Sequence, residues 1–413
     1  MDWIYKKIFT SFLNKIQIGT ITIFSGETKE IIFNVVRTND YVAKICVKDS
    51  DMNLFIKTVI KKSDIGFCEL YMKGIWWSPD VFSVMMTLIA NKKYLRTITF
   101  NLLSNSSDEE NIKHHYDVGN DFYMLWLTDD LHAYTCGFFF SPNDTLNTAQ
   151  YNKVHTIIKK LDIKPNEDVL DIGCGWGTIA NHIRENTHAN VDGVTISEEQ
   201  YKFVKQNHPS VNVFNVNIFD MPTDKKYDKI YSIGAFEHFK GVNYGRFFTK
   251  VNDLLKPGGR LVLHTMVHTT TAINSTINKQ ADTYITKYIF PGNQIPEHYW
   301  IMDSATDSKL NSIHVEYFGG YHYHKTLLHW NRNMMEQKQT ILSLGYTEEL
   351  IRLYELYFLG VSATFATNQL CIGQYIFEKK NDVTDIDYSF LQQPTTLQIP
   401  YLTLPYLTNS TNT

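Results

Sequence analysis

Apolar residues follow two different patterns along the chain, and the change between them divides it. In the first 17 positions, apolar residues recur at helical spacing beside lysines, namely Ile4, Ile8, Phe12 and Ile16. This spacing predicts an amphipathic helix. Three strand-like runs follow, at residues 20–24, 31–36 and 41–47. Together with a helical segment at 79–90, they predict a small α+β domain over residues 1–103.

The predicted helix of residues 1–17 has two interpretations. Its basic residues are Lys6, Lys7 and Lys15, which suit a helix that lies on an anionic lipid surface. A helix that packs its apolar face against its own domain is the commoner outcome. The sequence leaves both interpretations open.

From residue 169 onward, short apolar strands alternate with helices. Strands are predicted at residues 169–172, 191–194, 211–216, 229–233 and 260–265. A helix is predicted over 178–187, and Ser197 begins another, with Glu199 and Gln200 in its first turn. This alternation predicts the α/β fold class, with a doubly wound, mostly parallel Rossmann-like sheet. Polar composition predicts a linker at 104–111 and an extended or disordered tail at 381–413.

Composition narrows the class of protein. Hydrophobic residues make up 43% of the 413 positions and charged residues 20%, as in folded globular proteins. The net charge of −4 argues against nucleic-acid binding. No run approaches the ~20 apolar residues of a membrane span, and no signal peptide is visible, so we expect a cytoplasmic location. The five cysteines form no CxxC pair, which predicts reduced thiols and no metal site.

A glycine-rich loop, Asp171-Ile-Gly-Cys-Gly-Trp-Gly177, joins the first of these strands to a helix. Ligands of doubly wound sheets bind at this end of the strands. A lone glycine-rich loop also suits dinucleotide binding. However, the spacing is GxGxG, and Asp171 suits an amino-acid moiety better than a diphosphate. The turn at residues 256–260, Lys-Pro-Gly-Gly-Arg, is common in Rossmann-like methyltransferases. Together these features resemble the S-adenosylmethionine-dependent class, which implies that cofactor.

The second strand departs from that class. It ends in Thr195, where an acidic ribose ligand is usual, and Asp192 lies inside the strand, where it is a poor substitute.

Several motifs explain the departure, because together they resemble the cyclopropane-fatty-acyl-phospholipid synthases and the mycolic acid cyclopropane synthases. The motifs lie in family order at residues 115–123, 134–137, 149–150, 193–200, 232–239, 264–265 and 322–330. The resemblance implies a methyltransferase domain over 112–380. Residues 60–92 are similar to the N-terminal domain of the phospholipid-acting branch, which the mycolic-acid branch lacks.

The resemblance implies two sets of site residues. The cofactor-binding set is Tyr134, Thr135, Asp171, Gly173, Gly175, Thr195, Ile196, Gln200, Ile218 and Ile233. The catalytic set holds a bicarbonate ion and consists of Cys136, Glu237, His264, the backbone of Met266, and Tyr323. Bicarbonate has one hydroxyl donor and several acceptor sites, which these groups can satisfy. An anion beside a carboxylate is unfavourable, so a rival hypothesis makes Glu237 itself the base.

The implied reaction is cyclopropanation of a cis double bond in a membrane phospholipid. An alkene needs no general base before it attacks a methyl group, but the resulting carbocation needs a dry site and aromatic walls. We expect those walls from the aromatic residues of 116–123 and 138–140. Peripheral membrane binding is expected, and the resemblance is compatible with a homodimer. The alternatives are alkene methylation to a branched or methylene lipid, N-methylation of a small amine, and a non-catalytic lipid-binding protein.

Overall fold

The computed structural model describes residues 2–26, 29–95, 118–269 and 284–380. The predicted linker at 104–111, the predicted tail at 381–413 and the predicted boundary between the domains lie outside these ranges. So do the first residues of the motif at 115–123. We call residues 2–95 the N-terminal region and residues 118–380 the catalytic region.

The N-terminal region is a four-stranded sheet with helices, as predicted. Its strands have the order β2-β1-β3-β4 and comprise β1 (Thr20–Ser25), β2 (Ile31–Val36), β3 (Val42–Val47) and β4 (Trp76–Trp77). Its helices are α1 (Asp2–Leu13), α2 (Met52–Met72), α3 (Val81–Ala90) and α4 (Lys92–Leu95), with a 3₁₀ turn, η1 (Asp49–Asp51). Strand β1 pairs in parallel with β3 and antiparallel with β2, so the sheet is mixed.

Helix α1 packs on its own region, and the predicted apolar side is confirmed in part: Ile16, just after the helix, is buried, and Ile8 and Phe12 are half-buried. Phe9 and Leu13 are buried, whereas Ile4 is 52% exposed. The helix also ends at Leu13, earlier than predicted, because Asn91 ties down the backbone that follows. The side-chain oxygen of Asn91 accepts hydrogen bonds from the amides of Gln17 at 2.7 Å and Ile18 at 3.0 Å.

The catalytic region contains a seven-stranded sheet of order β10-β11-β9-β8-β5-β6-β7. The strands are β5 (Asp168–Ile172), β6 (Asn190–Thr195), β7 (Asn212–Asn215), β8 (Tyr227–Ile233), β9 (Leu255–His268), β10 (Leu310–Phe318) and β11 (Leu370–Lys379). Five neighbouring strands are parallel, and β11 and β10 extend the sheet antiparallel. The predicted α/β class is therefore confirmed. Strand β9 begins at Leu255 and so includes the turn at 256–260, which we placed before the strand.

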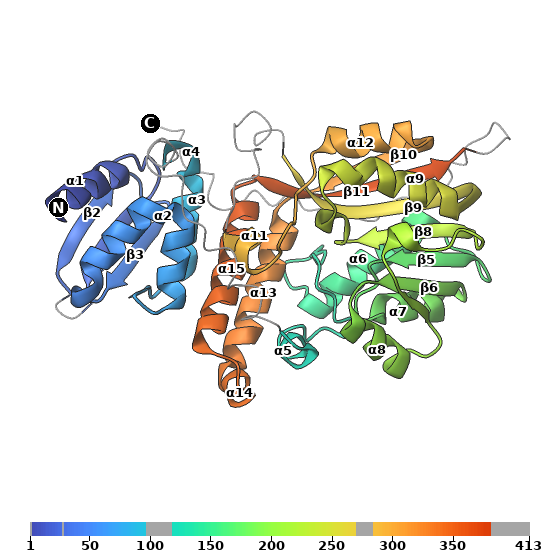
Figure 1. Cartoon of the computed structure of the whole chain (residues 1–413), viewed down its shortest axis with the longest axis horizontal. Coiled ribbons are helices and arrows are strands. Elements are labelled where there is room, and N and C mark those ends of the chain that lie inside the picture. Colours follow the sequence, from blue (N-terminus) through green and yellow to red (C-terminus); the bar gives the residue numbers. More distant parts are fainter. Residues whose placement is uncertain (1, 27–28, 96–117, 270–283, 381–413) are drawn as a thin grey trace.

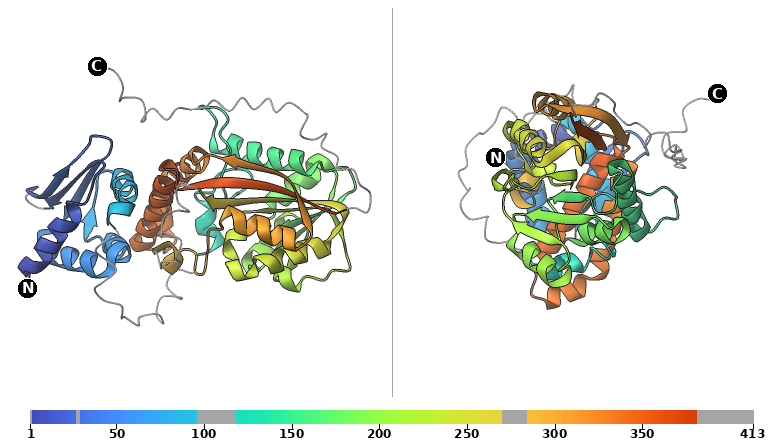
Figure 2. Two further views of the ribbon diagram at one scale, coloured as in Figure 1. Left: turned by 90° about the horizontal axis from the view of Figure 1, so that it is seen from above. Right: turned by 90° about the vertical axis from the view of Figure 1, so that its right-hand side faces the viewer.

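Helices cover both faces of this sheet (Figures 1 and 2). One face carries α6 (Leu146–Leu161), α7 (Thr178–Thr187) and α8 (Glu198–Asn207), and the other carries α9 (Tyr244–Leu254) and α12 (His298–Asp307). The remaining helices are α5 (Asn120–Met124), α11 (Tyr284–Tyr288), α13 (Tyr321–Glu336), α14 (Lys338–Ser343) and α15 (Glu348–Ala366). Short 3₁₀ turns are η2 (Ile218–Asp220), η3 (Phe236–His238) and η4 (Gly241–Asn243). No helix in the described ranges is both long and apolar enough to cross a membrane.

Helix α15 joins the two regions, and Figure 1 shows it with α13 between the blue N-terminal elements and the sheet. Its side chains Leu353, Leu356 and Leu359 belong to the same hydrophobic core as the N-terminal region. Its Ile351 and Phe358 belong to a second core, inside the catalytic region. The helix is thus buried on both sides, and the hydrophobic effect holds the two regions together.

Truncation of one α15 side chain tests this packing. Leu356 is fully buried, so Leu356→Ala should lower the free energy of unfolding by about 2–5 kcal/mol. Leu344→Ala is a matched control, because Leu344 is 50% exposed and its truncation should change stability by less than ~0.5 kcal/mol. Urea denaturation measures both variants. Equal, small effects would contradict the assigned role of α15.

Candidate active site

One cavity of about 1090 Å³ opens at the carboxyl ends of the parallel strands. Every position predicted to bind the cofactor lines it, namely Tyr134, Thr135, Asp171, Gly173, Gly175, Thr195, Ile196, Gln200, Ile218 and Ile233. The five positions predicted for the anion line the same cavity, namely Cys136, Glu237, His264, Met266 and Tyr323. Motifs that lie far apart in the sequence therefore converge on one site.

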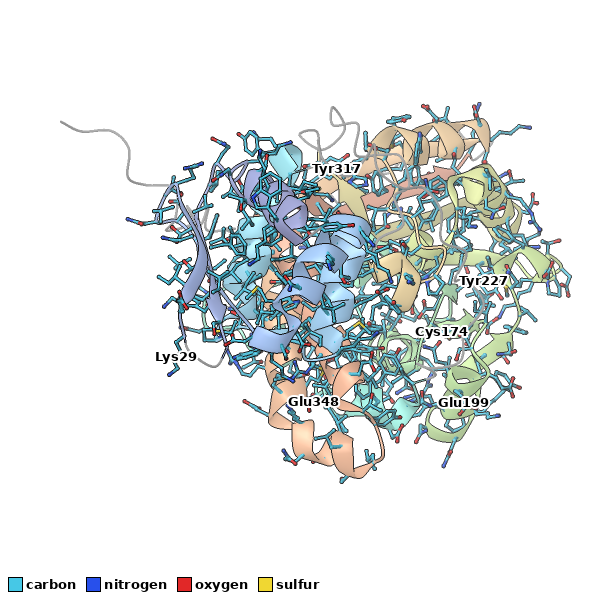
Figure 3. The ribbon with its side chains drawn as sticks, turned by 60° about the vertical axis from the view of Figure 1, so that its left-hand side comes forward. Lys29, Cys174, Glu199, Tyr227, Tyr317 and Glu348 are labelled. Carbon is cyan, nitrogen blue, oxygen red and sulfur yellow. The ribbon has the colours of Figure 1, made fainter. Side chains whose placement is uncertain are left out.

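The glycine-rich loop leaves space for a ligand. Gly173 and Gly175 have φ of +83° and +55°, a left-handed conformation that favours glycine. A Cβ added to Gly173 would lie 2.4 Å from the Cβ of Ala235, whereas a Cβ on Gly175 would meet nothing within 4 Å. Gly173 thus allows close packing with the loop after β8, and Gly175 faces open space. Figure 3 labels Cys174, which lies between them.

Asp171 is a buried carboxyl near the end of β5. It is 3% exposed, and the hydroxyl of Tyr231 donates a hydrogen bond to it at 2.9 Å. Burial raises its pKa to about 7, and the Tyr231 hydrogen bond opposes that shift. A cationic ligand group beside it would favour the ionised carboxylate.

The end of β6 is held in place by side-chain hydrogen bonds. The hydroxyl of Thr195 donates to Oε1 of Gln200 at 2.8 Å, which fixes the Gln200 amide next to the cavity. The side chain of Ser197 caps α8, as predicted, by accepting a hydrogen bond from the backbone N–H of Gln200 at 3.3 Å. Asp192 instead accepts hydrogen bonds from Lys225 and Tyr227, both at 2.8 Å, and does not line the cavity. It therefore has a structural role, as its place inside the strand indicates.

Glu237 is a buried carboxyl with one free oxygen. It is 2% exposed, and its Oε1 accepts a hydrogen bond from the backbone N–H of Met266 at 2.7 Å. Its Oε2 has no hydrogen-bond partner within the described residues. Burial raises the pKa of Glu237, and the Met266 hydrogen bond opposes this. The N–H of Met266, which we expected to face the anion, is therefore engaged by Glu237.

His264 belongs to a chain of polar groups that fixes its tautomer. Lys160 donates to Oε1 of Gln374, and this orients the Gln374 amide nitrogen toward Nδ1 of His264, 3.0 Å away. Because an amide nitrogen can only donate, Nδ1 accepts, and a neutral ring carries its proton on Nε2. Burial lowers the pKa of His264 well below its usual value, and nearby lysines lower it further. The ring is thus a neutral donor.

Lys153 is a buried cation that sequence reasoning missed. Its side chain is fully buried in α6 and donates to the hydroxyl of Thr135 and to Oε1 of Gln150, both at 2.6 Å. Among the described residues, it has no carboxylate within ion-pair distance. Burial lowers its pKa to about 8. The available signal was a lysine three residues after Gln150, on a helix face whose remaining buried residues are apolar.

The positive charge of Lys153 acts on the predicted anion ligands. It lowers the pKa of both the His264 ring and the Cys136 thiol, although burial dominates and raises that of Cys136. Buried charges in proteins are normally paired or bound to an ion. The Lys153 ammonium therefore adds positive charge behind the cavity wall, and the buried carboxyl of Asp129 lies near enough to act on it.

The prediction that aromatic residues of 116–123 and 138–140 form the cavity walls is wrong. Residues 138–140 do not line the cavity, because Phe138 stacks on Phe318 with ring centres 4.1 Å apart, inside the core. Phe122 and Tyr123 do not line it either, and Tyr116 lies outside the described residues. In the catalytic region, the aromatic lining comes instead from Tyr134, Trp176, Phe219, Phe239, Tyr284, Phe290, Trp300, Tyr323 and Tyr357. Burial raises the pKa of Tyr323 well above its usual value, so its hydroxyl stays neutral and can donate.

Known proteins are similar to this chain in sequence and in fold. A family model for mycolic acid cyclopropane synthetase matches residues 103–375. The cyclopropane-fatty-acyl-phospholipid synthase of Escherichia coli K12 is 31% identical over 82% of this chain and 88% of its own. Cyclopropane mycolic acid synthase 1 of Mycobacterium tuberculosis H37Rv is 30% identical over 65% of this chain and 96% of its own.

A solved structure agrees with both relatives. The mycolic acid cyclopropane synthase CmaA1, complexed with S-adenosylhomocysteine and CTAB, has a TM-score of 0.59 and 29% identity, over 67% of this chain and 99% of that one. The fold, the glycine-rich loop and these matches agree on S-adenosylmethionine as the cofactor. The chain belongs to the mycolic acid cyclopropane synthetase family of S-adenosylmethionine-dependent methyltransferases.

Proposed function

We propose that the protein transfers a methylene group from S-adenosylmethionine to the cis double bond of an unsaturated phospholipid acyl chain, forming a cyclopropane ring. The observation that carries the proposal is the buried set of Glu237, His264 and Tyr323 in the cavity that also contains the cofactor loop. The similarity to the E. coli synthase extends over 82% of this chain, against 65% for the mycobacterial relative, which favours a phospholipid.

The reaction needs one bond-forming attack and one proton removal. The alkene attacks the sulfonium methyl group, the C–S bond breaks, and a carbocation remains on the acyl chain. A base then removes a proton from the added methyl group, and that electron pair closes the ring. The protein's part is to align the alkene and keep water away from the cation. The aromatic lining, including Tyr134 and Phe290, suits this task.

We propose bicarbonate as the base, held by the buried groups of the site. The unpartnered Oε2 of Glu237 suits an acceptor for the bicarbonate hydroxyl, while Nε2–H of His264 and the Tyr323 hydroxyl suit donors to its oxygens. Lys153 offsets the repulsion between the anion and the Glu237 carboxylate. The rival hypothesis, with Glu237 as the base, agrees with its raised pKa and predicts a rate that does not depend on bicarbonate.

We also propose that the N-terminal region binds a membrane surface. Residues 1–95 carry 13 Lys and Arg against nine Asp and Glu, in a chain whose net charge is −4. Helix α1 leaves Trp3 69% and Ile4 52% exposed, close to Lys6 and Lys7. Exposed apolar side chains beside lysines suit an anionic lipid surface. A homodimer stays a prediction.

Incubation with S-adenosylmethionine and liposomes of monounsaturated phospholipid tests the reaction. We expect fatty-acid methyl esters heavier by one CH₂, about 14 Da, with no alkene signal by NMR. The same mass gain with an alkene or branch signal would replace ring closure by a different last step. Cofactor binding without any lipid product would favour an amine substrate or a non-catalytic lipid protein.

The variant Lys153→Met tests whether the buried ammonium helps to bind bicarbonate. Hydrogen bonds to charged groups contribute about 1.5–3 kcal/mol, so the variant should need roughly 10- to 100-fold more bicarbonate for half-maximal rate. The rate is measured in carbon-dioxide-free buffer with added bicarbonate. Lys159→Met is the matched control, because Lys159 is exposed on the same helix. If the rate does not depend on the bicarbonate concentration in the wild type or in either variant, Glu237 is favoured as the base.

The cofactor affinity should depend on pH through Asp171. Its carboxyl has a pKa raised to about 7, so below that value the protonated fraction grows and the attraction for the cationic cofactor is lost. The dissociation constant of S-adenosylmethionine should therefore rise about tenfold for each pH unit below 7. Calorimetry between pH 5 and 8 measures this, and Asp171→Asn should give a weak, flat profile. A wild-type profile without a break near pH 7 would contradict the assignment.

Liposome flotation tests the membrane surface. The double variant Trp3→Glu, Ile4→Glu should float less with anionic vesicles than the wild type, without loss of stability, because both side chains are exposed. Leu344→Glu in the catalytic region is the control and should float normally. Unchanged flotation of the double variant would remove α1 from the membrane contact.

A further inference from the structure

The active-site cavity continues into the interior of the N-terminal region. At one end it is lined by Glu237 and His264, and at the other by residues of β1, β3, α1, α2 and α3. We call this second part the inner chamber, and its wall includes Phe9, Ile23, Ile45, Phe55, Val59 and Met85. We propose that the inner chamber binds the methyl-terminal part of the substrate's acyl chain, beyond its double bond. This inference rests on the proposed function.

A passage at α15 joins the chamber to the catalytic groups. Tyr284, Gly360 and Cys68 line it, from α11, α15 and α2 respectively. The hydroxyl of Tyr284 donates to the backbone carbonyl of Leu356 at 2.8 Å, which holds the ring in place. A Cβ added to Gly360 would lie 2.4 Å from that hydroxyl and 2.9 Å from Cε of Met85. Gly360 therefore lets the ring and the methionine pack beside the helix where it crosses the passage.

The chemistry of the wall selects an apolar occupant. Among the described N-terminal residues that line the cavity, the polar ones are Ser63, Asp64 and Lys92, and the rest are apolar. Ile23 and Ile45 are each only 1% exposed. Ordered water needs two or more polar partners, which the part of the wall around Ile23 and Ile45 does not offer. A hydrocarbon chain fits it, with roughly a fourfold gain in affinity for each buried methylene.

The position of the double bond in the substrate explains why such a chamber is needed. The alkene lies inside the acyl chain, so hydrocarbon extends from it in two directions once it is aligned with the methyl donor. The ester and phosphate end needs polar partners or water. The methyl end needs neither, so an enclosed apolar chamber suits that end. The chamber would then set how much chain is accepted beyond the double bond.

Val59→Phe tests the chamber, because it adds volume to the wall far from the catalytic groups. The substrates are phospholipids whose double bond stands at a fixed distance from the ester and is followed by a short or a long methyl-terminal segment. We expect the variant to lose at least about tenfold in rate for the long segment relative to the short one. Ile45→Phe narrows the same chamber from the sheet and should act alike. The measured quantity is the rate with the long segment divided by the rate with the short segment. If this ratio equals that of the wild type in both folded variants, the proposal is overturned.

Ile56→Phe is the matched control. Ile56 is buried in the same helix but does not line the cavity, so its variant carries a similar overpacking cost and should leave the ratio unchanged. Melting temperatures of the three variants show that each is folded.

A binding measurement separates this inference from the proposed function. Fluorescence of cis-parinaric acid, an unbranched polyene fatty acid, reports chain binding without any reaction. Binding by the wild type that Val59→Phe weakens and Ile56→Phe preserves would support the chamber even if no cyclopropane product forms. Product formation with unaltered segment selectivity and unaltered probe binding would reject the chamber and leave the proposed function standing.

Discussion

The packing of α15 between two hydrophobic cores is the constraint on which the rest of the structure depends. Its leucines complete the core of the N-terminal region, and the opposite side of the helix packs on the aromatic core behind the active site. Gly360 stands on this same helix at the passage from the catalytic groups to the inner chamber. The relation between the two regions, and the continuity of the cavity, therefore follow from how one helix is buried.

Electrostatic balance is the second organising feature. The site brings together a buried carboxyl, a neutral imidazole and a buried ammonium that makes no ion pair within the described residues, although Asp129 acts on it from farther away. In a core without a ligand this arrangement would be costly, because buried polar groups need partners. The Oε2 of Glu237, which has no partner among the described residues, and the buried charge of Lys153 both suit a cavity that an anion and a cationic cofactor share. Stability has been given up locally where binding requires it.

Local patterns predicted a large part of this structure. Strand β2 and helix α7 have the predicted bounds, and the glycine-rich loop lies at the strand ends as the doubly wound pattern requires. The motifs also identified residues that prove to share one cavity, because each motif is local. Helix α15 was not predicted, since burial on both sides leaves little polar periodicity in residues 348–366. The antiparallel strands β10 and β11 were missed for a similar reason, because their partners are distant in the sequence.

The wrong and missing predictions at the site also arise from tertiary contacts that local patterns do not contain. The aromatic residues 138–140 lie next to Cys136, and proximity in sequence suggested a shared cavity, but Phe138 packs on Phe318, a partner distant in the sequence, inside the core. Lys153 and Gln374 belong to no charge pattern, and only tertiary contacts reveal that Lys153 is buried beside Thr135 and Gln150 and that Gln374 orients His264. The path of the chain after α1 depends on Asn91, 73 residues beyond Ile18.

Helix α15 also limits how this chain can change over evolutionary time. Within three consecutive positions, Leu356, Tyr357 and Phe358, the helix serves the N-terminal core, the cavity wall and the aromatic core. A substitution that suits one of these surroundings shifts the backbone that supports the other two. The two regions are therefore expected to accumulate changes in concert, so that an N-terminal region taken from a distant relative would fit this catalytic region only if α15 came with it.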